Sequence, residues 1–104
     1  MIVYNMPPVI DLFWASLPAQ RHMIAKHGVE LEEAIEAAES SIRHVRAADG
    51  PRGARRYVVP GKTFDGRRLW VVFEHEAQGR GRIITAREPE GDKERARHRR
   101  QRGD

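Results

Sequence analysis

RLWVVFEHEAQGRGRIITAR, residues 68–87, is the stretch that decides the fold of this 104-residue chain. It holds two runs rich in apolar and β-branched residues, Arg68–Glu76 and Gly81–Arg87, joined by the glycine-containing segment AQGRG. Runs of this length and composition, bounded by turn residues, predict two neighbouring antiparallel β-strands. The same stretch carries arginines at its ends and a Glu-His-Glu triplet in its middle. The strands are therefore expected to present charge as well as to build a core.

Upstream of this stretch, three further segments are expected to be strands. The segment Arg55–Thr63 is rich in β-branched residues and leads into an Asp-Gly turn signal at residues 65–66, as in a hairpin. Its Pro60 has no N–H to donate, which predicts a sheet edge or a bulge. Two shorter apolar segments, Ser41–Val45 and Val9–Trp14, are predicted to be short strands.

Two helices are predicted between the first strand and the others. Ser16 is a suitable N-cap, Pro18 is tolerated in the first turn, and Gly28 fits the left-handed position that ends the helix after His27. In the second helix apolar residues recur at the spacing of one helical face: Leu31, Ala34, Ile35, Ala38 and Ile42. Its other face is predicted to be solvated and is acidic: Glu30, Glu32, Glu33, Glu36 and Glu39.

The segment Gly91–Gln101 is polar and arginine-rich, and we expect a helix that frays at its end. We divide the chain into an N-terminal arm at 1–8, a single α+β domain at 9–91 and a basic C-terminal helix or tail at 92–104. The predicted fold is α+β: β-α-α followed by a three- to four-stranded antiparallel sheet and a C-terminal helix. We expect the helices to lie on one side of the sheet.

The net charge of +4 hides an uneven distribution. Residues 1–41 hold two basic and six acidic side chains, a balance of −4, whereas residues 42–104 hold seventeen basic and nine acidic ones, a balance of +8. A strongly basic half indicates an anionic partner such as nucleic acid. The alternative is a surface whose charge only keeps the protein in solution.

Several function classes are excluded by what the sequence lacks. It has no cysteine, which excludes disulfides, thiolate zinc sites and a cysteine nucleophile. The five histidines show no metal-ligand spacing, so neither a metal nor another cofactor is predicted. No apolar run approaches the roughly 18 residues of a membrane span, and the first Lys or Arg is Arg21, which argues against a secretory signal. We predict a cytoplasmic protein.

Four motifs, in this order along the chain, are similar to those of one known family. They are KHGVELEEA at 26–34, GKTFDGRRLWVVFE at 61–74, RIITAR at 82–87 and KERARHRR at 93–100. Together they resemble the BrnT family of ribonuclease toxins from type II toxin–antitoxin systems. The resemblance covers nearly the whole chain, from Val9 to Arg100. It implies a RelE-like fold, a metal-independent endoribonuclease activity on RNA, and neutralisation by a small BrnA-like antitoxin encoded beside the toxin.

Two other classes of function stay open. The first is a module of the same fold that binds RNA or an antitoxin without cutting. The second is an interaction protein that adds a partner's strand to an exposed sheet edge. Pro60 and the short strand at Ser41–Val45 make that side of the sheet the expected open edge.

Metal-independent RNA cleavage needs a proton acceptor, a proton donor, and cations for the charge that develops on the phosphate. The predicted catalytic residues lie on the predicted strands: Lys62, Glu74, His75, Arg82 and Arg87. We expect Arg87 to neutralise the scissile phosphate with help from Arg82 and Lys62, and either Glu74 or His75 to transfer the proton. Lys26 or His27 is the next choice for that transfer. The odd spacing of Arg82 and Arg87 puts them on opposite faces of a regular strand, so they share a site only if a bulge or strand end intervenes.

Other arginines of the basic half are predicted to contact RNA: Arg67, Arg68, Arg80, Arg95 and Arg99. The C-terminal run would attract phosphates without choosing a sequence, unless it is only a solvated tail. Trp14, Tyr57 and Trp70 are candidates for base stacking. Large aromatic side chains are usually buried, however, so we expect at least two of the three in the core.

Overall fold

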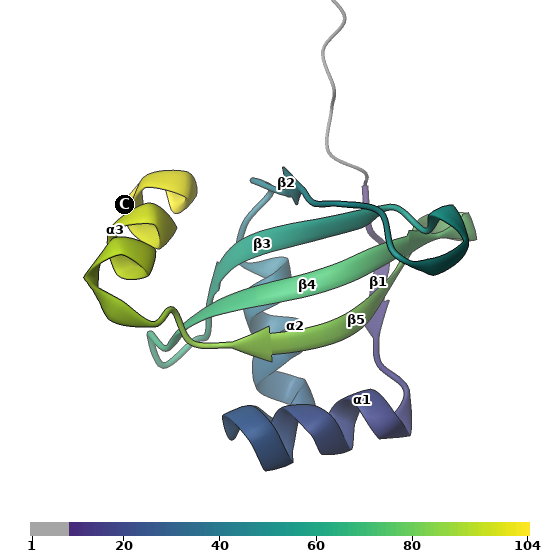
Figure 1. Cartoon of the computed structure of the whole chain (residues 1–104), viewed down its shortest axis with the longest axis horizontal. Helices are drawn as coiled ribbons and strands as arrows, with labels where there is room; N and C mark the ends of the chain where they lie inside the picture. Colours follow the sequence, from purple (N-terminus) through teal and green to yellow (C-terminus); the bar gives the residue numbers. More distant parts are fainter. Residues whose placement is uncertain (1–8) are drawn as a thin grey trace, which may run out of the picture.

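The structure, a computed structural model, describes residues 9–104, so the predicted arm at residues 1–8 lies outside the described residues. Its centre is a five-stranded sheet in the order β1-β5-β4-β3-β2 (Figure 1). The strands are β1 Leu12–Trp14, β2 Val45–Arg46, β3 Arg56–Lys62, β4 Arg68–Glu76 and β5 Arg80–Arg87. The β2-β3-β4-β5 pairs are antiparallel, and β1 pairs with β5 in parallel.

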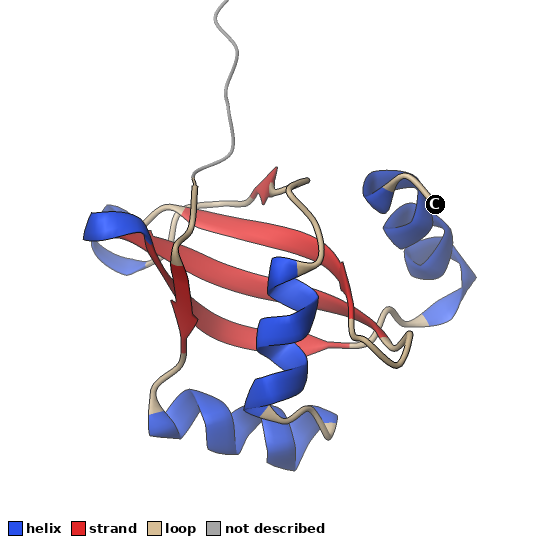
Figure 2. Cartoon of the chain, turned by 180° about the vertical axis from the view of Figure 1, so that it is seen from behind, coloured by secondary structure: helices blue, strands red, loops and turns tan. Residues whose placement is uncertain are grey.

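The helices surround this sheet on two sides. Helix α1, Leu17–His22, continues as a π-helical turn, Met23–His27, and α2 spans Leu31–Glu39. Figure 2 shows α2 crossing one face of the sheet, with α1 below it. Helix α3, Gly91–Arg102, stands at the end of the sheet. Two single 3₁₀ turns, Pro51–Gly53 and Ala77–Gly79, complete the described elements.

The predicted order of elements and the α+β class are confirmed. The expectation that all helices lie on one side was wrong for α3, because its side chains help to line the face opposite α2. The two shortest predicted strands shrink to β1 and β2, because only three and two of their residues find partners in the sheet. Ile42 was wrongly placed on the second helix, which ends at Glu39; its side chain is 83% exposed.

Pro60 does mark a partly open edge. Strand β2 pairs only with Tyr57 and Val58, so it does not reach the later residues of β3. There the Pro60 carbonyl accepts a hydrogen bond from Arg102 of α3, and the Lys62 N–H donates to the Ser40 hydroxyl. Side chains outside the sheet therefore satisfy the backbone where a strand partner is missing.

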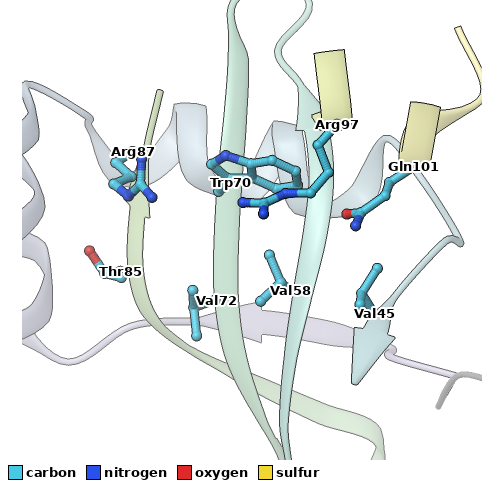
Figure 3. A pocket seen from close by; sticks show the side chains of 8 residues that line it. All are labelled: Val45, Val58, Trp70, Val72, Thr85, Arg87, Arg97 and Gln101. Atoms are coloured by element: carbon cyan, nitrogen blue, oxygen red, sulfur yellow. The ribbon is translucent and has the colours of Figure 1, made fainter. Parts of the chain in front are cut away.

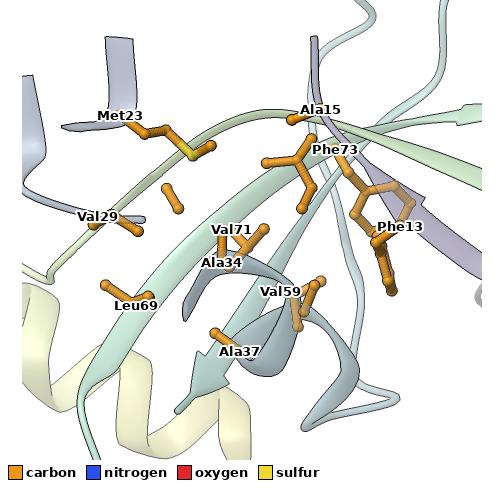
Figure 4. Close-up of a cluster of buried hydrophobic side chains, with 13 residues drawn as sticks. Phe13, Ala15, Met23, Val29, Ala34, Ala37, Val59, Leu69, Val71 and Phe73 are labelled. Atoms are coloured by element: carbon orange, nitrogen blue, oxygen red, sulfur yellow. The ribbon is translucent and has the colours of Figure 1, made fainter. Parts of the chain in front are cut away.

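The core lies between α2 and the sheet, as Figure 4 shows. Every second residue of β4, namely Leu69, Val71 and Phe73, is fully buried on this face. Gly61 of β3 allows the closest approach: a Cβ there would lie 2.3 Å from the Ala37 carbonyl oxygen of α2. The absence of a side chain at this position lets the helix backbone rest on the strand.

Helix α3 is an integral part of the domain, because His98 anchors it. The His98 ring is fully buried and meets the Trp70 ring edge-on, with 4.8 Å between centroids. Its Nε2 lies 3.1 Å from the Leu69 carbonyl oxygen, and its Nδ1 lies 3.3 Å from a guanidinium nitrogen of Arg68. This pairing fits the neutral ring, with Nε2–H donating to the carbonyl and Nδ1 accepting from Arg68.

The anchoring by His98 makes stability depend on pH. Burial lowers the pKa of His98 below its ordinary 6.5, although the hydrogen bond to the Leu69 carbonyl opposes this. Burial lowers the pKa of His44 in the same way. Below pH 6.5 the unfolded chain therefore binds more protons than the folded chain, and stability falls as pH falls. We expect the melting temperature to drop between pH 7.5 and 5.5, where carboxylates are still ionised.

Replacing His98 with glutamine tests this assignment, because the amide keeps a donor and an acceptor but cannot titrate. We expect H98Q to lower the melting temperature at pH 7.5 but to depend less on pH than the parent. The exposed His75 supplies the matched control, H75Q, which should leave the melting temperature at pH 7.5 unchanged. If H98Q and the parent lose equal stability on acidification, His98 is not the residue responsible.

Candidate nucleic-acid interface

The sheet face opposite α2 carries the candidate site, and a β-bulge arranges it. Val72 pairs with Thr85 but the next residue, Phe73, pairs with Ile83, so β5 has one extra residue at Ile84. This extra residue reverses the alternation of side chains along β5. Arg82 then pairs with Glu74 and Arg87 with Trp70, two residues of the same β4 face. The bulge thus brings Arg82 and Arg87 onto one face, which a regular strand could not do at this odd spacing.

At one end of this face, three charged residues form a row across three strands. The Glu74 carboxylate accepts hydrogen bonds from Arg56 Nε, at 2.8 Å, and from Arg82 Nη2. Its side chain is only 3% exposed. Burial raises the pKa of Glu74, but the hydrogen bonds from Arg56 and Arg82 outweigh it and hold the pKa below its ordinary value. Glu74 is therefore an ionised anchor whose two oxygens are both occupied.

At the other end, Trp70 is surrounded by side chains of α3 and β5. The Arg97 guanidinium lies over its ring, 5.4 Å from the centroid. Its indole Nε1 donates to Glu94 Oε1 at 3.1 Å, and Arg87 Nη1 donates to the same oxygen at 2.9 Å. Glu94 also accepts from the Glu90 N–H at 3.1 Å. One carboxylate thus gathers three donors from separate elements.

These donors make the Glu94 position a natural anion site. The hydrogen bonds from Arg87 and from the Glu90 N–H lower the pKa of Glu94 to about 2. An arginine fork, an indole N–H and a backbone N–H also suit the oxygens of a phosphate. A phosphate group could compete with the Glu94 carboxylate for the same donors.

Between the two ends lies an apolar hollow of about 300 Å³. Its floor is one row across four strands, in register: Val45, Val58, Val72 and Thr85. Its remaining wall consists of Trp70, Arg87, Arg97 and Gln101. In Figure 3, Thr85 and Arg87 stand at one end of the hollow and Gln101 and Val45 at the other.

A second, polar hollow of about 430 Å³ lies on the other side of Arg87. Its lining includes Lys26, His27 and Arg95 together with the β5–α3 connection. Burial, His22, Lys26 and Arg87 all lower the pKa of His27, in that order of effect. The neutral imidazole is therefore favoured near neutral pH, and it shares this hollow with Arg87.

Comparison with known proteins places this geometry on a known fold. No protein-family model matches the sequence, and none of the curated proteins matches it either. Among solved structures, the crystal structure of BrnT, a ribonuclease toxin of Brucella abortus, superimposes with a TM-score of 0.58. The match covers 77% of this chain and 97% of that chain, at 16% sequence identity. The chain has the fold of a BrnT ribonuclease toxin. The similarity to BrnT that the motifs indicated is thereby confirmed for the fold.

On this BrnT fold, the five predicted catalytic residues lie at three places. Arg87 stands beside Trp70, whereas Glu74 and Arg82 stand at the opposite end of the face. His75 follows Glu74, so its side chain starts from the other face of β4, although it borders the same hollow as Glu74 and Arg82. Trp70 and Glu74 are four residues apart on β4, which is about 13 Å along a strand. A group that transfers a proton must lie within roughly 3 Å of the reacting atom or act through one water. The side chains at the two ends make separate contacts: Arg87 pairs with Glu94, and Arg82 pairs with Glu74.

Lys62 lies at the third place, opposite Arg68 near the end of β3. Arg68 there bonds to Asp104, at 2.8 Å, and faces His98. This corner is where α3 joins the sheet. The structure does not bring Lys62 to Arg87.

Four of the five arginines predicted to contact RNA have side-chain partners in the BrnT-like fold. Arg67 bonds to Glu33, Glu88 and the Gly28 carbonyl, so it ties α2 to the strands. Arg68 holds α3, and the Arg80 guanidinium lies over the Trp14 ring at 5.3 Å. Arg95 pairs with Asp92 within α3, and Arg99 is exposed on the same helix.

The three aromatic candidates also have partners. Trp14 donates from Nε1 to Glu76 at 2.7 Å, and Tyr57 stacks on Phe73 with 5.5 Å between centroids. Trp70 is 5% exposed. Only Trp70 lines the apolar hollow, so it is the ring that a ligand on this face would meet.

Sequence reasoning missed Arg56, Glu94 and Arg97. Glu94 and Arg97 are three residues apart in a predicted helix and so share one side of it. That spacing could have indicated a pair of charges facing one target. Arg56 had no such signal, because its pairing with Glu74 depends on the register between β3 and β4.

Proposed function

We propose that the chain is the toxin of a type II toxin–antitoxin system. It is a cytoplasmic endoribonuclease that cleaves RNA without a metal ion and is neutralised by a BrnA-like antitoxin encoded beside it. The observation that carries this proposal is the position of Arg87. Arg87 lies on β5 between the apolar hollow and the polar hollow that contains His27. Its guanidinium already binds an anion, the Glu94 carboxylate.

The reaction assigned to this place is attack of the RNA 2′-oxygen on the adjacent phosphorus. Arg87 receives the phosphate in place of the Glu94 carboxylate and neutralises the charge that develops on it. The neutral imidazole of His27 accepts the proton of the 2′-hydroxyl. The bond from phosphorus to the 5′-oxygen breaks, and that oxygen takes a proton, from Lys26 or from water. The products are a 2′,3′-cyclic phosphate and a 5′-hydroxyl.

The other end of the face has a second task in this proposal. Arg82, 38% exposed, binds a different phosphate of the same strand, and Glu74 fixes its position. His75 remains a candidate for proton transfer at that end, where it lies in one hollow with Glu74, Glu76 and Arg82. The exposed arginines of α3, Arg95 and Arg99, attract the strand from a distance.

A second candidate function is binding without cleavage. One observation favours it. The Glu94 carboxylate already accepts hydrogen bonds from the Arg87 guanidinium, so a phosphate can bind Arg87 only if Glu94 moves away. An RNA or an antitoxin that binds the rest of this sheet face, away from Arg87, would not need to displace Glu94. Strand addition at the partly open β3 edge is the form that an antitoxin contact would take, and the added strand would replace the Arg102 and Ser40 side chains that bond to the β3 backbone there.

Expression of the chain alone tests the proposal directly. We expect induction to stop growth and to shorten total RNA, and co-expression of the neighbouring gene to restore both. The purified protein should cut a single-stranded RNA in excess EDTA and leave 2′,3′-cyclic phosphate ends. If growth is normal while intact RNA is bound, the non-cleaving module is the correct function. Loss of cutting in EDTA would overturn the metal-free mechanism alone.

A further inference from the structure

The apolar hollow stands out on a face that is otherwise covered by ion pairs. Its floor of three valines and Thr85 lies between the charged row at Glu74 and the arginines beside Trp70 (Figure 3). Val45 is 37% exposed, and Val58 and Val72 are partly exposed. An exposed patch of apolar side chains with polar groups around its rim is typical of a ligand site.

One polar atom of the hollow lacks a partner. The Thr85 hydroxyl oxygen is buried and makes no hydrogen bond within residues 9–104. A buried hydroxyl without a partner is costly, and native structures usually satisfy such groups. At the opposite end of the hollow stands the side-chain amide of Gln101, which can both donate and accept. Rotation of the Thr85 side chain would turn its hydroxyl toward the hollow, which then offers an apolar floor with hydrogen-bonding groups at two ends.

We propose that this hollow binds one nucleobase of the RNA strand, next to the phosphate held by Arg87, and that Thr85 and Gln101 recognise its edges. The inference rests on the proposed function, because it assigns a base subsite to the same substrate. It makes Thr85 and Gln101 residues that determine specificity, with no part in the chemistry.

The shape and chemistry of the hollow fit a base better than an aliphatic group. A base is flat and apolar on its faces but carries donors and acceptors around its edge, which matches a valine floor with polar ends. Arg97, whose guanidinium lies over the Trp70 ring, 5.4 Å from its centroid, adds a planar cation of the kind that stacks on bases. An aliphatic side chain would fill the floor but leave Thr85 unsatisfied.

The position beside Arg87 supports an RNA strand as the source of that base. Arg87 lines both the apolar hollow and the polar hollow with His27. A nucleotide joins a base to a phosphate through one sugar, so a base in the first hollow places its phosphate at Arg87. The cleavage position would then follow from the base that Thr85 and Gln101 accept.

The experiment measures binding of the four nucleoside 3′-monophosphates by NMR, with valine methyl groups labelled in the full chain. A stacked base should shift the Val58 and Val72 methyl signals. The Val59 and Val71 methyls, buried on the opposite face, are internal controls that should not move. We expect one or two of the nucleotides to bind more tightly than ribose 5-phosphate, the probe without a base.

Two substitutions separate base recognition from phosphate binding. Thr85→Val and Gln101→Leu should each weaken the preferred nucleotide by about five- to tenfold, the effect of one lost hydrogen bond, and leave ribose 5-phosphate unchanged. Both keep the volume of the side chain, and melting temperatures verify the fold. Unshifted Val58 and Val72 methyls, or equal binding of ribose 5-phosphate and all four nucleotides, would overturn the inference. RNA cleavage that persists in that case leaves the proposed function intact, whereas nucleotide binding without cleavage overturns only the function.

Discussion

Arg87→Ala is expected to reduce RNA cleavage by about 100- to 1,000-fold, the cost of removing one preorganised charge donor from a site of this type. Cells that express R87A should grow normally without antitoxin. The measurement is the initial rate of cleavage of a labelled single-stranded RNA, together with growth after induction. Binding to the antitoxin should persist, because the partly open β3 edge lies elsewhere on the sheet.

The effect is large because Arg87 cannot easily be replaced by its neighbours. Arg97 lies over the Trp70 ring, and Arg82 is about 13 Å away along the sheet by strand geometry. Lysine at position 87 would keep the charge but lose the paired hydrogen bonds of the guanidinium. We therefore expect R87K to recover only part of the rate.

Glu94 distinguishes a catalytic role of Arg87 from a structural one. Arg87 and Glu94 are partners, so both R87A and Glu94→Gln loosen the contact between β5 and α3. If Arg87 only holds α3, the two variants should lose equal activity. If Arg87 binds the scissile phosphate, R87A should lose cleavage and E94Q should keep or gain it, since the competing carboxylate is neutralised. Arg99→Ala, an exposed arginine of α3, is the control for general loss of charge.

Much of the fold could be predicted because the decisive signals were local. The apolar runs of β4 and β5, the caps at Ser16 and Gly28 and the periodicity of α2 all act within a few residues. Ile42 shows the limit of such a pattern. It continued the stripe of α2 in sequence, but the helix had already ended at Glu39. The parallel pairing of β1 with β5 joins residues nearly seventy positions apart, and nothing local encodes it.

The site was harder to predict because it depends on register. Arg82 and Arg87 could be named from their positions on a strand, but only the bulge at Ile84 puts them on one face. The same register puts Glu74 between two arginines, where the sequence had predicted a catalytic glutamate. His98 was part of a charged run, and its burial against Trp70 depends on how α3 returns to the sheet.

Glu74→Ala is expected to destabilise the fold by about 3 kcal/mol, the lower end of the cost of breaking a buried ion pair. The substitution leaves the guanidinium groups of Arg56 and Arg82 facing one another across β4 without their shared anion. The lower end applies because these side chains are 31% and 38% exposed, so water can partly solvate them. For a domain of this size the melting temperature should fall by about 12 °C or more.

A double-mutant cycle decides whether the charged row of Arg56, Glu74 and Arg82 acts as a unit. Arg82→Ala removes one partner, and the loss in the E74A/R82A double variant should be smaller than the sum of the single losses, by about 1–3 kcal/mol. Glu88→Gln, which removes the exposed partner of Arg67, should change stability by no more than about 0.5 kcal/mol.

Cleavage by E74Q, measured well below its melting temperature, should stay within about tenfold of the parent, since Glu74 sits too far from Arg87 to move a proton there. If E74A stays folded but no longer cleaves RNA, Glu74 is a catalytic residue after all, and the active site lies at the Arg82 end of the sheet.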